Sequence, residues 1–177
     1  MAQLVAFLRG INLGKRTVKM DELREAFEEM GFSNARTLIA SGNVLFEADR
    51  VPELEQTIEA GLKKAFGFDI GTIIRSIDEL KEFASNNPFD GFEAGTDRKF
   101  YALFLAQPDA HKLEYPTIVP GDFEVVWKTD RDLFAVALRM ENGRFGAGLD
   151  SLLKTFGKGV TMRNWNTVLR LIDKAAA

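Results

Sequence analysis

The sequence contains no cysteine and one histidine, His111, among its 177 residues. The absence of cysteine excludes disulfides, thiol nucleophiles, thiolate zinc sites and iron–sulfur clusters, and one histidine is too few for the usual histidine-rich zinc sites. We therefore predict no metal and no cofactor. No apolar run approaches the 18 residues of a membrane span, and the first residues do not resemble a signal peptide. These absences predict a cytoplasmic protein of bacterial type with no membrane partner.

Acidic residues are absent before Asp21, although the whole chain has a net charge of −3. Residues 1–20 contain four basic side chains, and residues 151–177 contain five basic side chains and one acidic one. The excess of acid is therefore confined to residues 21–150. Such an asymmetry favours a phosphate-bearing or polyanionic partner at the basic ends. The alternative is that the two ends lie apart and that each is a solvated face.

The first half has the pattern of a βαββαβ unit. Residues 4–8 are apolar at every position, which is typical of a strand covered on both faces. A helix is predicted from Met20 to Met30, ending at Gly31, and a hairpin over 37–46. A second helix is predicted to begin at Pro52 and to end at Gly67, before a strand over 70–75. This order is the ferredoxin-like arrangement.

The second half repeats this order of elements. A third helix follows the first half and begins with a capping box, Ser76 and Glu79. Further along, the pattern predicts strands over 99–105, 123–127 and 133–140, a short helix over 108–113, a helix ending at Gly157, an extended piece over 159–162, and a last helix from Trp165. We predict an α/β (α+β) fold of two ferredoxin-like βαββαβ-related halves in tandem. The predicted domains are 1–90 and 96–177, and the polar stretch 88–98 connects them.

Four segments together resemble one bacterial family, the domain of unknown function 1697. They are residues 7–14 (FLRGINLG), 18–23 (with VKM and Leu23), 41–46 (SGNVLF) and 163–167 (RNWNT). The resemblance covers essentially the whole chain, and the segments occur in the expected order. It implies an α/β protein of two ferredoxin-related halves and implies no established activity.

The loop after the first strand has the composition of an anion site. Gly10 and Gly14 permit a tight backbone, and Arg9 and Lys15 supply positive charge, so that backbone N–H groups and cations can surround an anion. The glycine spacing is one residue short of a Walker A loop, and Arg16 stands where that motif has Ser or Thr, so a true P-loop is disfavoured. The helix that follows has no Ser, Thr, Asp or Asn cap before Met20. The alternative is a structural turn with solvated cations.

Two further segments contribute candidate ligand residues. Ser41 and Asn43 would be hydrogen-bonding groups, since a nucleophilic Ser41 needs a base and His111 is far away in sequence. The alternative there is a plain hairpin turn. Arg163 and Asn166 flank the start of the last helix, where Asn164 can act as the cap. The alternative for these is capping with surface polarity. Asp90, Glu93 and Asp97 fit a solvated acidic linker better than a cation site.

The predicted function is binding of a phosphate-bearing or other anionic small ligand. The predicted ligand-binding residues are Arg9, Gly10, Asn12, Gly14, Lys15, Ser41, Asn43, Arg163, Asn164 and Asn166. Two other classes stay open: an enzyme acting on a small anionic substrate, and a protein-interaction module without a pocket. Nucleic-acid binding is a weaker branch, because the strands lack the exposed aromatic side chains of an RNA-recognition sheet. The sequence predicts neither a catalytic residue nor an oligomeric state.

Overall fold

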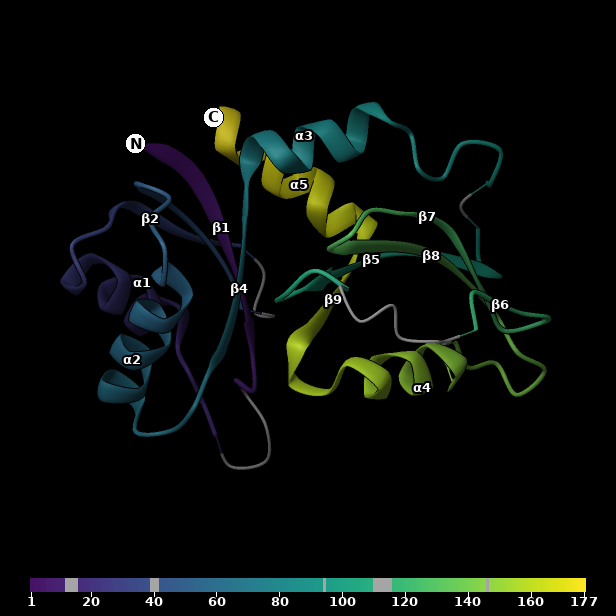
Figure 1. Ribbon diagram of the computed structural model, residues 1–177, viewed down its shortest axis with the longest axis horizontal. Helices are drawn as coiled ribbons and strands as arrows, with labels where there is room; N and C mark the ends of the chain where they lie inside the picture. Colours follow the sequence, from purple (N-terminus) through teal and green to yellow (C-terminus); the bar gives the residue numbers. More distant parts are fainter. Residues whose placement is uncertain (12–15, 39–41, 94, 110–115, 146) are drawn as a thin grey trace. The chain divides into compact units, whose positions relative to one another are not determined.

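The computed structural model describes residues 1–11, 16–38, 42–93, 95–109, 116–145 and 147–177. The chain divides into two compact units, one formed by Met1–Lys81 with Leu171–Ala177 and the other by Glu82–Arg170. Each unit contains one antiparallel sheet (Figure 1). The two sheets and their helices confirm the predicted α+β fold of two halves. The domain boundaries expected from the sequence stay predictions.

The sheet of the first unit has the strand order β2-β3-β1-β4, with every neighbouring pair antiparallel. Two helices, α1 and α2, lie on one side of this sheet (Figure 1). The four strands and two helices follow one another along the chain in the order βαββαβ, so the ferredoxin-like arrangement predicted for the first half is present. The elements are β1 (Ala2–Arg9), α1 (Met20–Glu29), β2 (Ser33–Leu38), β3 (Asn43–Ala48), α2 (Leu54–Phe66) and β4 (Gly71–Ser76).

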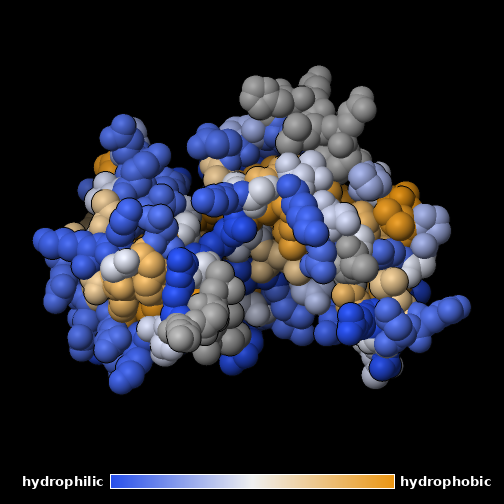
Figure 2. All heavy atoms as spheres, turned by 90° about the horizontal axis from the view of Figure 1, so that it is seen from below, coloured by the Kyte–Doolittle hydropathy of each residue, from blue (hydrophilic) through white to orange (hydrophobic). Residues whose placement is uncertain are grey.

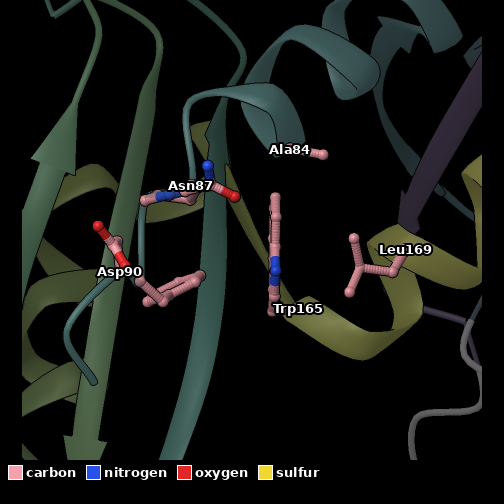
Figure 3. A pocket seen from close by; sticks show the side chains of 7 residues that line it. Ala84, Asn87, Asp90, Trp165 and Leu169 are labelled. Atoms are coloured by element: carbon pink, nitrogen blue, oxygen red, sulfur yellow. The ribbon is translucent and has the colours of Figure 1, made fainter. Parts of the chain in front are cut away.

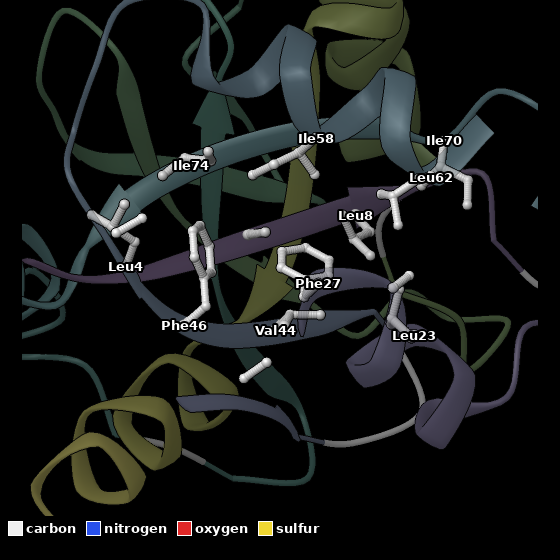
Figure 4. Close-up of a cluster of buried hydrophobic side chains, with 14 of the residues drawn as sticks. Leu4, Leu8, Leu23, Phe27, Val44, Phe46, Ile58, Leu62, Ile70 and Ile74 are labelled. Carbon is white, nitrogen blue, oxygen red and sulfur yellow. The ribbon is translucent and has the colours of Figure 1, made fainter. Parts of the chain in front are cut away.

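The core of the first unit lies between its sheet and the two helices. Three alternate residues of β1 point into this core: Leu4, Ala6 and Leu8. Figure 4 shows Leu8 at the same end of the core as Leu23 of α1. The intervening residues Val5 and Phe7 are equally buried on the opposite face. Both faces of β1 are therefore covered, as its uninterrupted apolar sequence predicts.

Helices α1 and α2 end at the predicted glycines, but α2 does not begin at the predicted proline. Gly31 and Gly67 have φ of +91° and +82°, in the left-handed region that suits glycine after a helix. The expected start at Pro52 is wrong, because α2 begins at Leu54. Glu53 precedes it with φ of +65°, and this left-handed residue separates Pro52 from the first helical turn.

Helix α3 (Ile77–Ser85) begins directly after β4 with the predicted capping box. The backbone N–H of Glu79 donates to Ser76 Oγ at 3.0 Å, and the backbone N–H of Ser76 donates to a carboxylate oxygen of Glu79 at 2.6 Å. Two N–H groups at the start of the helix are therefore satisfied by two side chains of the same turn.

The sheet of the second unit has the order β6-β7-β8-β5-β9. Without the two-residue edge strand β6, this order is that of the first sheet. The expected short helix over 108–113 is not seen at residues 108–109, and 110–115 lie outside the described residues. The elements are β5 (Arg98–Leu105), β6 (Ile118–Val119), β7 (Phe123–Lys128), β8 (Asp132–Leu138), α4 (Ala147–Phe156), the 3₁₀ turn Gly157–Gly159, β9 (Val160–Asn164) and α5 (Trp165–Ala176).

The two faces of the second sheet are covered by different kinds of side chain. One face packs against Leu149 and Leu152 of α4 and is mainly aliphatic. The other face is aromatic and is centred on Phe134. The ring of Phe134 lies 4.8–6.4 Å, centroid to centroid, from four others, those of Phe83, Phe89, Trp127 and Trp165.

The last turn of α5 belongs to the first unit, where side chains of β1 and β2 donate to two of its carbonyl groups. Gln3 Nε2 donates to Ala175 O at 3.0 Å, and Arg36 Nη1 donates to Lys174 O at 3.0 Å. Lys174 Nζ in turn donates to Thr37 O at 3.0 Å. These bonds join the last turn of α5 to β1 and β2, and Lys174 O also accepts from the backbone N–H of Ala177 at 3.2 Å.

Hydrophilic side chains predominate on the face of the molecule shown in Figure 2. Among the described residues, the large hydrophobic side chains that are exposed are Met1, Val51, Ile118 and Leu169. Within the same part of the chain, no helix combines the length and the apolar character that crossing a membrane requires.

Candidate functional site

The first part of the candidate site is the end of strand β1. Arg9 is the last residue of the strand, is partly buried, and lies opposite Gly71 of β4 in the sheet register. Gly10 follows with φ of +79°. Lack of space does not explain this glycine, because a Cβ at Gly10 would lie 3.6 Å from Asp69 O, an ordinary contact distance. The left-handed backbone conformation explains it, since residues with a Cβ seldom adopt that conformation. The strand therefore ends in an abrupt change of direction.

The turn before β3 lies directly against this end of β1. The backbone N–H of Leu8 donates to Gly42 O at 2.9 Å. Gly42 has φ of +81°, and a Cβ placed on it would lie 2.6 Å from Cδ1 of Ile11. The sequence predicted these two loops separately as ligand-binding, and the first unit brings their described residues together.

Basic and acidic side chains both lie near the same end of the first sheet. The guanidinium of Arg16 lies over the ring of Phe68, with its Cζ 4.8 Å from the ring centroid. Helix α1 begins here without a side-chain cap, as predicted, because the capping position is occupied by Lys19. Its first turn also contains Asp21 and Glu22, which already place negative charge at the helix N-terminus.

Asn43 is the first residue of β3 and is fully buried. Its Nδ2 donates to Leu38 O at 3.2 Å, which ties together the two strands of the hairpin. The amide side chain therefore has a structural partner, and its role as a ligand residue stays a prediction.

The second part of the candidate site is the junction between β9 and α5. Arg163 lies beside Ala102 of β5, which is also the register partner of Phe134, so Arg163 is on the aromatic face. Its Nη1 donates to Thr161 Oγ1 at 2.6 Å and to Met162 O at 3.0 Å, so the side chain turns back along its own strand. Burial lowers the pKa of Arg163 to about 10, and the group is still a cation at neutral pH.

Asn164 caps helix α5 as the sequence predicts. Its Oδ1 accepts a hydrogen bond from the backbone N–H of Asn166 at 2.9 Å. The side chain of Asn166 is exposed on the first turn of the helix. Capping thus explains Asn164, and it leaves the side chain of Asn166 available to solvent or to a ligand.

Four predicted residues, Asn12, Gly14, Lys15 and Ser41, lie outside the described residues, as does His111. The others fall into two groups. Arg9, Gly10 and Asn43 belong to the first unit, whereas Arg163, Asn164 and Asn166 belong to the second. A composite site built from both groups stays a prediction.

Metal binding has no support in the side chains that the structure describes. Within those residues, no group of three or more His, Cys, Asp or Glu side chains is arranged to hold a metal ion.

The family model described as "Protein of unknown function (DUF1697)" matches residues 1–134. The chain belongs to this family. The match confirms the family resemblance, with three of the four segments inside the matched residues and the fourth, 163–167, beyond them. The family description assigns no activity.

One solved structure similar to this DUF1697 protein is that of the conserved bacterial protein SP0830 from Streptococcus pneumoniae. The two chains are 20% identical, with a TM-score of 0.70, and the match covers 100% of this chain and 99% of the other. At this identity the likeness shows a shared fold. No curated protein matches the chain.

Sequence reasoning missed two features of this DUF1697 chain. The first is Arg75 of β4, which is 1% exposed and has a guanidinium that donates to Ile74 O at 2.9 Å. The signal for it is the sequence Ile74-Arg75-Ser76 before a helix, which matches Met162-Arg163-Asn164 before α5. The second is Phe89, which is buried although it stands in the polar stretch assigned as a connection.

Proposed function

We propose that this protein binds a phosphate-bearing or otherwise anionic small molecule at the end of strand β1. The observation that carries the proposal is the contact between the two loops of the first unit. The bond from Leu8 N–H to Gly42 O holds Gly42 beside the end of β1, and a Cβ on Gly42 would lie 2.6 Å from Ile11 Cδ1, which supports the proposal that ligand groups from both segments lie close together. A ligand bound after Arg9 would therefore also meet the residues of the turn before β3.

The chemistry of this region fits an anion better than a cation or an apolar group. Arg9 and Arg16 are described basic residues of the segment, and Lys15 completes the basic set. Backbone N–H groups near Gly10 add partial positive charge, whereas the start of α1 already carries Asp21 and Glu22. Gly10 has no side chain, so a ligand can approach the backbone closely.

Contacts from the start of α5 to an anionic ligand are proposed separately, for the second unit. Arg163 and Asn166 would supply a cation and an amide from the second unit. This part of the proposal is separable, because loss of the loop residues and loss of the α5 residues can be measured independently.

The test is isothermal titration with inorganic phosphate, pyrophosphate and a nucleoside monophosphate at low salt. At least one of these should give saturable heat. Arg9→Gln and Lys15→Gln should each weaken binding by about tenfold, since each removes one charge-assisted contact. Lys81→Gln, an exposed cation on α3, is the matched control and should bind as the wild type does.

Two results would contradict the proposal. One is the absence of saturable heat with all three anions. The other is an affinity of Arg9→Gln and Lys15→Gln equal to that of Lys81→Gln. If Arg163→Gln binds as the wild type does while Arg9→Gln is weakened, the site belongs to the first unit alone.

A further inference from the structure

The second unit contains a pocket of about 290 Å³ that the proposed anion site does not use. It lies where the end of α3 and the chain after it face the first turns of α5 (Figure 3). All of its lining residues belong to the second unit: Ala84, Asn87, Pro88, Phe89, Asp90, Trp165 and Leu169.

Five of the seven lining residues are apolar, and two of these five are aromatic. The rings of Phe89 and Trp165 meet edge to face, with centroids 5.4 Å apart, and both side chains are more than nine-tenths buried. The ring of Phe89 is also stacked on that of Phe100, with centroids 4.6 Å apart, and this contact fixes the position of the Phe89 ring. Leu169, one turn further along α5, leaves 37% of its surface exposed. A flat apolar group placed here would cover the exposed part of Leu169 and the small exposed remainder of the two rings.

The polar groups of the pocket are an amide and a carboxylate. Asn87 has φ of +46°, a conformation that L-residues other than glycine seldom adopt. A short turn holds it, in which Asn87 N–H donates to Ala84 O and Asp90 N–H donates to Asn87 O. Among the residues that the structure describes, Asp90 has no ion pair and no basic side chain lines the pocket.

We propose that this pocket binds a small organic amine that carries an aromatic ring, with the ring against Phe89 and Trp165 and the ammonium group at Asp90. The ring would gain edge-to-face contacts with the wall, and the ammonium would gain a charge-assisted hydrogen bond from its N–H to the carboxylate. The amide oxygen of Asn87 is a second acceptor at the rim. Anionic ring compounds are disfavoured by the same carboxylate.

This site is independent of the proposed anion site. Its charge preference is opposite and its residues are different. The guanidinium of Arg163, two residues before Trp165, is bound to Thr161 and Met162 and is not part of the lining.

The test uses phenethylamine as the probe and the fluorescence of Trp165 as the signal. The chain has two tryptophans, so Trp127→Phe leaves Trp165 as the reporter. Phenethylamine should change its emission saturably. 2-Phenylethanol, which has the same ring and chain without the charge, should bind about tenfold more weakly, and phenylacetate should not bind.

Two substitutions separate the charge from the shape of the pocket. Asp90→Asn should weaken phenethylamine by about tenfold and leave 2-phenylethanol unchanged, because only the charge-assisted bond is lost. Asn87→Gly keeps the left-handed backbone and removes the amide, so it should weaken the amine by a smaller factor. Glu93→Gln, an exposed acid three residues from Asp90, is the control.

Several outcomes would overturn the proposal. They are no saturable change with phenethylamine, equal affinity for the amine and the alcohol, or an Asp90→Asn variant that binds as Glu93→Gln does. If Trp127→Phe does not fold, the wild-type protein with ¹⁵N-labelled tryptophan gives two indole signals. Phenethylamine should then shift one of them, and a failure to shift either would also overturn the proposal.

Discussion

The two units have the same strand order around their central strands, β1 and β5, yet they cover their sheets with different side chains. The described core of the first unit is mainly aliphatic, with a group of three phenylalanines, Phe27, Phe32 and Phe46. In the second unit, one face of the sheet is aliphatic and the other is aromatic. The shared strand order therefore does not depend on which apolar residues fill the core, only on where they recur.

The closest correspondence between the units is at the junction of the edge strand and the following helix. In the first unit, Arg75 donates to Ile74 O and Ser76 caps α3. In the second unit, Arg163 bonds Met162 O and Asn164 caps α5. Arginine, cap and helix follow one another without a spacer in both. This repeat lies in backbone geometry and capping chemistry more than in sequence identity.

The largest expected effect comes from the two central phenylalanines. Phe46→Ala and Phe134→Ala should each lower the free energy of unfolding by about 3–5 kcal/mol, because each removes a buried ring. Both tryptophans belong to the second unit, so Phe134→Ala should also change native tryptophan emission, and Phe46→Ala should not. Urea denaturation followed by fluorescence and circular dichroism measures both. An equal change in native emission would contradict this difference between the units.

A smaller effect is expected at two glycines with positive φ. Gly42→Ala in the first unit should cost about 2–4 kcal/mol, since the left-handed backbone costs about 1–2 kcal/mol and the new methyl group would overlap Ile11. Gly157→Ala in the second unit should cost only about 1–2 kcal/mol, because a Cβ there meets nothing within 4 Å. Thermal and urea unfolding give both values, and equal costs would show that the contact with Ile11 relaxes freely.

The two helix caps should differ by about 1 kcal/mol. Glu79 and Thr167 occupy the same position of α3 and α5, the third residue of the helix. Glu79→Ala removes the bond from Ser76 N–H and should cost about 1 kcal/mol. Thr167→Ala removes no capping bond and should stay within about 0.5 kcal/mol of the wild type. Equal losses in urea denaturation would mean that the capping box adds nothing to a single cap.

The smallest effect is a pH dependence confined to the second unit. Burial raises the pKa of the Tyr101 phenol above its usual value of 10. The folded protein therefore holds this proton longer than the unfolded chain, and the stability associated with it is present below pH 10 and is lost as pH rises through the folded pKa. Absorbance titration of the wild type and Tyr101→Phe, in buffer and in urea, should show a phenol that titrates later in the native state. Identical titration in both would refute the shift.

Local features of the chain were predicted well because they depend on neighbouring residues. The capping box of Ser76 and Glu79, the cap at Asn164 and the helix ends at Gly31 and Gly67 all involve residues within a few positions of one another. The apolar run of residues 4–8 likewise predicts a strand covered on both faces. The start of α2 was misplaced because proline fits a first helical position in general, while a left-handed Glu53 intervenes in this chain.

The candidate site was predicted only in part, and for a physical reason. The chemistry of Arg9, Gly10 and the Gly42 turn is visible in the sequence, but their proximity depends on the pairing of β1 with β3. Arg75 shares a local pattern with Arg163, an arginine directly before the cap of a helix, but that pattern does not say that its side chain is 1% exposed. The pocket was missed because the polar composition of 88–98 hides Phe89, whose ring is buried against Phe100 and Trp165.

The sequence alone determined the type and order of most helices and strands, the turns that end them, and membership of an uncharacterised family. Tertiary structure alone decided that Gly42 lies against the end of β1 and that Arg75 is buried. It also decided that the last turn of α5 belongs to the first unit and that a pocket lies beside Trp165. Periodicity and capping are short-range properties, encoded within one or two turns of chain. Contacts between residues more than a hundred positions apart, such as Arg36 with Lys174, depend on how whole elements pack, and no local pattern contains that information.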